Sequence, residues 1–170
     1  MNTLDIVLNL SLLALMVLTQ IGERPLNRWT YLRPALLTVA VAGFFLGSVP
    51  TQGNDLYLYA IAVAGGALLG LVALGLMRLD WDAQGRRLTA RAGLAYAAVW
   101  VGVIGGRMLF AELATHGWAQ QVGRFSYEHQ ITGADAWRAA FVLMALSMIA
   151  ARTLGLAVRA ALTRTRRALA

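Results

Sequence analysis

Apolar residues come in five long blocks along this chain, and short polar segments separate them. Most blocks lack the regular polar face that a helix on the surface of a water-soluble domain shows. Because a helix rises roughly 1.5 Å per residue, blocks of this kind can cross a hydrocarbon core of about 30 Å. The pattern predicts an all-α membrane protein, a five-transmembrane-helix bundle that forms a single domain over residues 1–170. The predicted spans and the basic tail after them are 4–21, 35–49, 56–77, 94–114, 137–158 and 159–170.

Two of the polar segments between the blocks predict local structure, and their sequence patterns differ. Residues 22–34 are typical of a short polar turn between the first two helices. Between the third and fourth blocks, residues 79–81 and 87–89 alternate polar and apolar positions around a turn that contains Gly85. Alternation on both sides of a glycine turn predicts a short cytoplasmic β-hairpin. The alternative is a polar connector that a tryptophan anchors at the membrane surface.

The composition narrows the chemistry. Hydrophobic residues make up 59% of the chain and charged residues only 14%, which supports the membrane assignment. Cysteine is absent, so thiol redox chemistry, Cys-ligated zinc and iron–sulfur clusters are excluded. Lysine is absent too, which excludes a Schiff-base cofactor site and a P-loop lysine. The sequence contains no enzyme signature motif, and we expect no cofactor and no bound metal.

The arginines indicate how the helices are oriented. They concentrate in the first loop, the third loop and the C-terminal tail, whereas the second loop has none. The positive-inside rule therefore places the N-terminus outside and the C-terminus in the cytoplasm of a bacterial inner membrane. We expect the first block to be retained, because no basic segment precedes it and no A-x-A cleavage site follows it. The basic face is expected to meet anionic lipid headgroups rather than nucleic acid.

Several short motifs along the chain resemble one family. They are Arg24-Pro25 after the first helix, the hairpin, Gly105-Gly106-Arg107 in the fourth helix and Ala151-Arg152 in the last. In this layout the chain resembles the CcdC-like family of small bacterial integral membrane proteins, a former domain of unknown function. The resemblance implies a membrane bundle and a neighbourhood associated with cytochrome c maturation, with no assigned activity. The long fourth loop departs from the family pattern.

Arg107 lies inside the fourth apolar block, where a charge is costly. On helices that run in opposite directions, Arg107 and Arg152 both aim their side chains toward the bilayer midplane. One interpretation is that Arg107 bonds backbone carbonyls, water or an acid of the chain, with Asp5 and Glu112 as candidate partners. A second is that Arg107 and Arg152 bind an anionic group such as a phosphate or carboxylate. A third is that a partner protein supplies an acidic residue.

The fourth loop gathers aromatic residues and both histidines, His116 and His129. The spacing of the two histidines matches no metal-ligand pattern. We expect an amphipathic segment whose aromatic rings rest at headgroup level. A functional alternative is a lid over an outward-facing cavity. The lid candidates are Trp118, Phe125, Tyr127 and His129.

The third helix contains Gly66 and Gly70 four residues apart. Small residues at this spacing let two helices approach closely. We expect them to pack helices within the bundle, and a homo-oligomer interface is the alternative.

Together these features predict a small polytopic membrane protein without enzymatic activity. It binds an anionic or amphipathic ligand, or serves as an accessory subunit for transport or maturation, alone or with a partner membrane protein. The alternative is an intramembrane enzyme that acts on a lipid or isoprenoid-like substrate. Its acids would come from the outer face: Asp5, Asp55, Glu112, Glu128 and Asp135.

Overall fold

A computed structural model describes residues 22–25, 28–46, 49–82 and 87–168 of the chain. The first predicted span, 4–21, lies outside the described residues, as does Asp5. The chain divides into two compact units, and each is described by itself. The first unit comprises Met1–Leu26 and Gly75–Phe110, and the second comprises Asn27–Leu74 and Ala111–Ala170.

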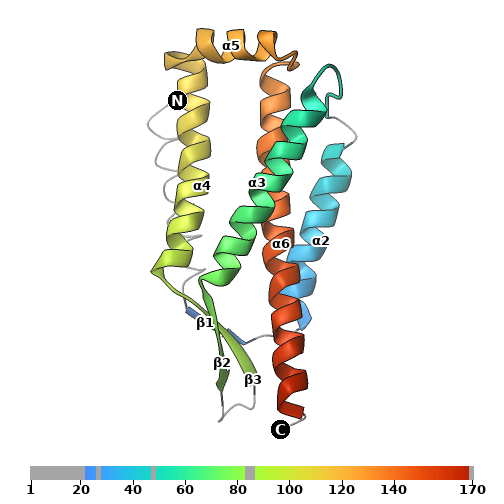
Figure 1. Cartoon of the computed structure of the whole chain (residues 1–170), viewed down its shortest axis with the longest axis vertical. Coiled ribbons are helices and arrows are strands. Elements are labelled where there is room, and N and C mark those ends of the chain that lie inside the picture. Colours follow the sequence, from blue (N-terminus) through green and yellow to red (C-terminus); the bar gives the residue numbers. More distant parts are fainter. Residues whose placement is uncertain (1–21, 26–27, 47–48, 83–86, 169–170) are drawn as a thin grey trace. The chain divides into compact units, whose positions relative to one another are not determined.

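Helices dominate the described part of the chain (Figure 1). Three of them are long and apolar enough to cross a membrane: Asp55–Gly75, Leu94–Gly117 and Ala134–Thr163. These helices correspond to the third, fourth and fifth predicted spans. The helices are α2 (Arg28–Leu46), α3 (Asp55–Gly75), α4 (Leu94–Glu112), a π-helical turn (Leu113–Gly117), α5 (Ala119–Glu128) and α6 (Ala134–Ala168).

The bounds of α2 differ from the second predicted span. The helix begins at Arg28 and ends at Leu46, and its apolar part, Leu32–Gly43, is shorter than the three candidate spans. The segment 22–34 is therefore not a simple turn. Hydropathy marks where apolar residues begin, whereas a helix continues into polar residues that are good helix formers, such as arginine. Pro34 is tolerated inside the helix, and its carbonyl accepts a hydrogen bond from Thr38 Oγ1 at 2.8 Å.

The basic tail also differs from the prediction. α6 runs without interruption for 35 residues, so the tail from residue 159 onward is helical as far as Ala168. The sequence there holds no glycine or proline after Gly155, and alanine, leucine and arginine all favour helix.

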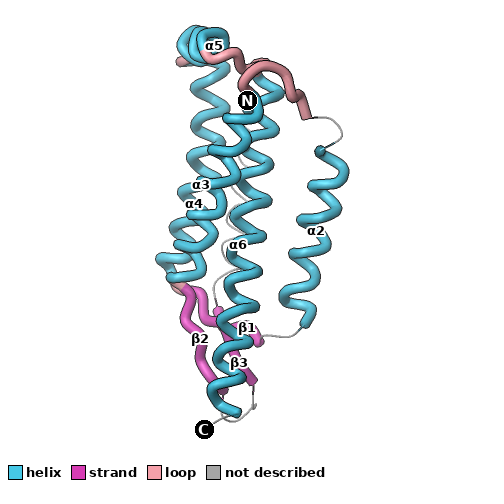
Figure 2. The backbone as a smooth tube through the Cα atoms, turned by 45° about the vertical axis from the view of Figure 1, so that its right-hand side comes forward, coloured by secondary structure: helices cyan, strands magenta, loops and turns pink. Residues whose placement is uncertain are grey.

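The first unit contains a three-stranded antiparallel sheet (Figure 2). Strands β2 (Met77–Asp82) and β3 (Arg87–Ala92) form the predicted hairpin. A third strand, β1 (Gly22–Pro25), was not predicted and pairs with the other side of β3. The strand order is β1-β3-β2, so the segment after the first apolar block is tied to the hairpin.

The second unit is organised around α6. Helix α3 crosses α6 at the two glycines: a Cβ on Gly66 would lie 2.1 Å from the backbone oxygen of Met144. A Cβ on Gly70 would lie 2.4 Å from the backbone oxygen of Met148. The glycine pair thus packs two helices of one chain, as predicted, and α2 runs beside α6 as well.

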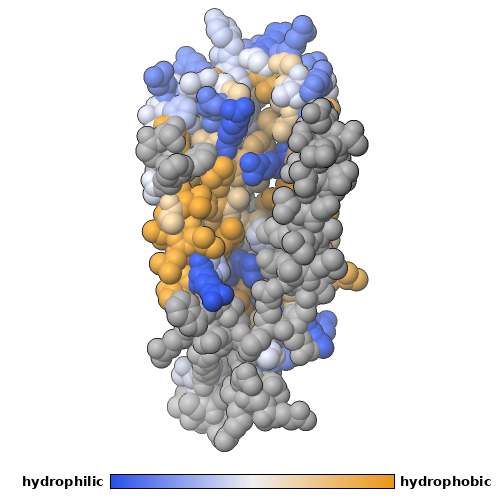
Figure 3. Space-filling model, turned by 180° about the vertical axis from the view of Figure 1, so that it is seen from behind, coloured by the Kyte–Doolittle hydropathy of each residue, from blue (hydrophilic) through white to orange (hydrophobic). Residues whose placement is uncertain are grey.

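Many side chains that cover these helices are apolar and exposed. Leu36, Leu37 and Val39 on α2 project outward, and so do Leu68 and Val72 on α3. Figure 3 shows apolar side chains gathered over part of the described surface on one face. An apolar exterior on long apolar helices is the arrangement expected of a protein that is surrounded by lipid.

Candidate functional site

Arg107 lies within the candidate span Leu94–Gly117, and its side chain is exposed. Its position is about 20 Å along the helix axis from Leu94, at the usual helical rise. The two preceding residues, Gly105 and Gly106, leave the helix surface open, since no described atom lies within 4 Å of a Cβ built on either. Consecutive helix residues lie about 100° apart, so Gly105, Gly106 and Arg107 lie on different faces of α4.

Arg152 occupies a different environment. It lies in α6 within the candidate span Ala134–Thr163, is half-buried, and has its Nε buried. Arg152 also interacts with another group of the protein. The two arginines belong to different compact units. A common anion site formed by Arg107 and Arg152 thus stays a prediction.

The two acids predicted as partners of Arg107 are Asp5 and Glu112. Asp5 lies outside the described residues. Glu112 is exposed at the end of α4, and its Oε1 lies 3.2 Å from Nδ1 of His116, one helical turn further on. The hydroxyl of Thr115 also lies 2.9 Å from that histidine nitrogen. Glu112 therefore takes part in a local polar cluster around the π-helical turn.

The fourth loop forms α5, which runs across the start of α6 (Figure 1). The helix is amphipathic, because Trp118, Val122, Phe125, Ser126 and His129 follow one another at helical spacing on one face. The predicted amphipathic segment is thus a helix of 10 residues. Its opposite face is polar.

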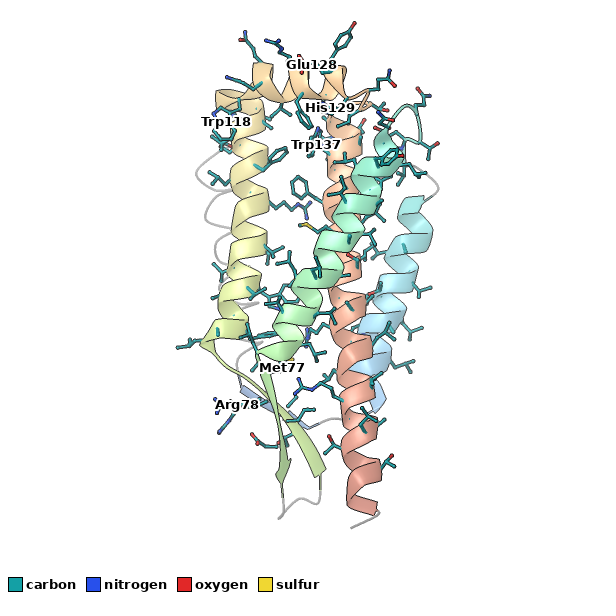
Figure 4. All side chains as sticks on the ribbon, in the orientation of Figure 1. Met77, Arg78, Trp118, Glu128, His129 and Trp137 are labelled. Carbon is teal, nitrogen blue, oxygen red and sulfur yellow. The ribbon has the colours of Figure 1, made fainter. Side chains whose placement is uncertain are left out.

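An aromatic cluster holds α5 to α6. The rings of Phe125 and His129 stack with centroids 4.0 Å apart, and Phe125 tilts against Trp137 of α6 at 6.3 Å. The indole Nε1–H of Trp137 donates to Ser126 Oγ at 3.1 Å, and the Ser126 hydroxyl donates to the Val122 carbonyl at 2.8 Å. Figure 4 shows His129 and Trp137 together where α5 meets α6.

The four lid candidates therefore separate into two pairs. Phe125 and His129 belong to the aromatic cluster that anchors α5. Trp118 and Tyr127 are exposed, Tyr127 with 87% of its surface accessible. On the polar face Arg124 donates to Glu128 Oε1 at 2.7 Å. A lid function stays a prediction.

Asp55 is one of the five outer-face acids named from the sequence, and its burial was not predicted. Its side chain is 0% exposed at the first turn of α3. Its Oδ1 accepts the backbone N–H of Thr132 at 2.9 Å, and its Oδ2 accepts a short hydrogen bond from the Thr132 hydroxyl. The only sequence signal is an aspartate at the beginning of a helix, which favours the positive end of the helix dipole.

The backbone next to Asp55 also contacts the segment that precedes α6. The Asn54 N–H donates to the Gln130 carbonyl at 3.0 Å. Gly53 has φ +59°, and a Cβ there would lie 2.2 Å from the same carbonyl oxygen. Only glycine fits this close approach. We call the contacts of residues 53–55 with residues 130–132 the α3–α6 clasp.

The other outer-face acids in the described ranges are engaged separately. Glu112 contacts His116, Glu128 pairs with Arg124, and Asp135 accepts from Arg138 at 2.9 Å. Within residues 22–25, 28–46, 49–82 and 87–168, no group of three or more His, Asp or Glu residues is placed to hold a metal ion. The described acids are thus distributed over several local contacts.

Three of the described helices are long and apolar enough to cross a membrane, and this length and composition are those of a small multi-pass membrane protein. Comparison of the chain with protein-family models, with curated proteins and with solved structures gave no match.

Proposed function

We propose that this chain is a non-enzymatic, multi-pass protein of a bacterial inner membrane, with its N-terminus outside, that binds an anionic or amphipathic ligand at Arg107. The observation that supports the proposal is a charged side chain exposed on an apolar candidate span. An arginine at the centre of a bilayer helix costs about 3 kcal/mol on insertion scales, and more in simulations. An anion bound from the bilayer offsets this cost.

The chemistry of guanidinium favours a particular kind of ligand. Its planar fork of N–H donors matches the oxygens of a phosphate or carboxylate, which it binds bidentately. Gly106 lies about 100° round the helix from Arg107, and no described atom is within 4 Å of a Cβ built on it, so the neighbouring face of α4 has room for an acyl or isoprenoid chain. A ligand with an anionic head and an apolar tail fits both features.

The test is native mass spectrometry of the full-length protein purified in mild detergent, comparing wild type with Arg107→Leu. The expected result is a reproducible non-protein mass on wild type that Arg107→Leu loses. Arg124→Leu is the matched control, because it removes the same charge from an exposed position outside the candidate spans. Arg107→Lys keeps the charge without the fork and should retain the mass more weakly.

Two results contradict this proposal. One is equal retention by wild type and Arg107→Leu, with circular dichroism showing that both are folded. The other is a wild-type protein that carries no additional mass and co-purifies instead with a second membrane protein. The latter result supports the accessory-subunit role that the layout, with its resemblance to CcdC-like proteins, suggests.

A further inference from the structure

The hairpin in the first unit places two arginines directly opposite each other. In the β2–β3 register, Met77 pairs with Ala92 and Arg78 pairs with Arg91. Directly opposed residues in an antiparallel pair have Cβ atoms about 4.5–5.5 Å apart. Met77 and Ala92 are buried, whereas Arg78 and Arg91 are both exposed. Figure 4 shows Met77 and Arg78 at the start of β2.

This arginine pair lies next to the ends of two apolar helices. Arg78 follows shortly after Gly75, where one candidate span ends, and Arg91 shortly precedes Leu94, where the next begins. Strand residues rise about 3.3 Å each, so the pair lies within roughly 10 Å of both helix ends. That depth corresponds to the headgroup layer of a bilayer, whose hydrocarbon core spans about 30 Å.

The sheet separates polar from apolar side chains. Successive strand residues point to opposite faces, so Arg78 and Asp80 share a face of β2, and Arg91 shares it with Thr89 of β3. On the outer side of β3, Glu23 of β1 is the register partner of Arg91. Arg91 already interacts with another group of the protein. A guanidinium has five N–H donors, so Arg91 can keep that contact and still bind an anion.

Two like charges directly opposite each other repel across a sheet, and an anion that contacts both arginines adds to the attraction that the acids on this face, Glu23 and Asp80, already provide. A phosphodiester has two free oxygens, and each can accept from one guanidinium. We propose that Arg78 and Arg91 bind the headgroup phosphate of an anionic phospholipid in the leaflet that borders the hairpin. This site is separate from Arg107 and does not depend on the ligand proposed there.

The test measures the binding of one lipid to the full-length protein in detergent by native mass spectrometry. The probes are phosphatidylglycerol, which is anionic, and phosphatidylcholine, which is zwitterionic. One arginine near an anionic surface contributes about fivefold in affinity, and two contribute about 30-fold. Arg78→Gln/Arg91→Gln should therefore bind phosphatidylglycerol about 30-fold more weakly than wild type, and either single variant about fivefold.

The matched control is Arg124→Gln/Arg138→Gln, which removes the same charge from two exposed arginines in ion pairs. It should change phosphatidylglycerol affinity by less than about twofold. Phosphatidylcholine carries the same phosphodiester, but its choline cation offsets the attraction to the two arginines, so wild type should bind it more weakly and its affinity should fall less in Arg78→Gln/Arg91→Gln. If the control loses as much affinity as the hairpin variant, the effect is net charge alone and the site is disproved.

Two further measurements keep the result decisive. Arg78→Lys/Arg91→Lys retains both charges without the bidentate fork and covers the case in which the glutamine variant does not fold; it should lose about threefold. Inorganic phosphate should neither bind measurably by calorimetry nor displace the lipid at equal concentration. Phosphate binding as tight as that of the lipid would assign the pair to soluble phosphates and overturn the lipid proposal. The two sites are separate if Arg78→Gln/Arg91→Gln loses phosphatidylglycerol binding but keeps the non-protein mass that Arg107→Leu is expected to lose.

Discussion

The α3–α6 clasp and the hairpin sheet both carry charge close to the ends of apolar helices, but they treat it in opposite ways. In the clasp, the Asp55 carboxylate is buried and accepts hydrogen bonds from one residue, Thr132. In the sheet, Arg78 and Arg91 are exposed side by side. The buried carboxylate is satisfied within the chain and serves the fold, whereas two exposed arginines side by side can bind an external anion in addition to the contact that Arg91 already makes.

Asp55→Ala is expected to cause the largest loss of stability. The change removes both hydrogen bonds that the buried Asp55 carboxylate accepts from Thr132, which costs about 3 kcal/mol in the free energy of unfolding. Chemical unfolding in detergent, followed by circular dichroism, measures the loss. Asp135→Ala is the control, because that carboxylate is exposed and pairs only with Arg138. Equal losses in the two variants would remove the distinction between a structural and a surface acid.

Gly66→Ala tests the helix packing below the clasp. Its new Cβ would meet the Met144 carbonyl and the Ser147 hydroxyl, each 2.1 Å away, so α3 and α6 must separate. We expect a destabilisation of about 2 kcal/mol. Gly65→Ala provides a neighbouring control, because no described atom lies within 4 Å of its Cβ, and it should be neutral or slightly stabilising. Thermal unfolding should show a clearly lower melting temperature for Gly66→Ala and an equal or slightly higher one for Gly65→Ala.

Trp137→Phe tests the attachment of α5. Phenylalanine keeps the ring contact with Phe125 but loses the hydrogen bond to Ser126, which contributes about 1 kcal/mol. Hydrogen exchange should show faster exchange over residues 119–128, with residues in the α3–α6 interface unchanged. A double-mutant cycle with Ser126→Ala isolates the bond, and full additivity would show that it contributes nothing.

Arg78→Gln should have the smallest effect and the opposite sign. In detergent without anionic lipid, it relieves repulsion with Arg91 and should stabilise the protein by up to about 0.5 kcal/mol. Unfolding curves with and without phosphatidylglycerol measure the change. Added lipid should reverse it, since wild type then gains a bound phosphate that the variant lacks. A clear destabilisation in lipid-free detergent would show that Arg78 serves the fold, as Asp55 does.

Local patterns account for what the sequence predicted well. Long apolar blocks predicted α3, α4 and α6, and alternation around Gly85 predicted the β2–β3 hairpin. Both features depend on neighbouring residues, so they can be read along the chain.

Long-range pairing accounts for what was missed. Strand β1 is four residues long and exists because β3 lies beside it. The partner of Asp55 is 77 residues away, so nothing near Asp55 distinguishes it from a solvated acid. The environment of Arg107 was only partly predictable, because its place in a helix follows from local pattern and its exposure does not.

The continuity of α6 has a mechanical consequence. Trp137 ties the start of the helix to α5, and further along Arg159 donates to the Leu74 carbonyl at the end of α3 at 2.9 Å. These two fastenings lie about 33 Å apart on one uninterrupted helix. Sliding of α6 along α3 would break the Arg159–Leu74 hydrogen bond, and sliding of α6 past α5 would break the Trp137–Ser126 hydrogen bond. One continuous helix thus connects the contact with α5 at its start to the contact with the end of α3 further along.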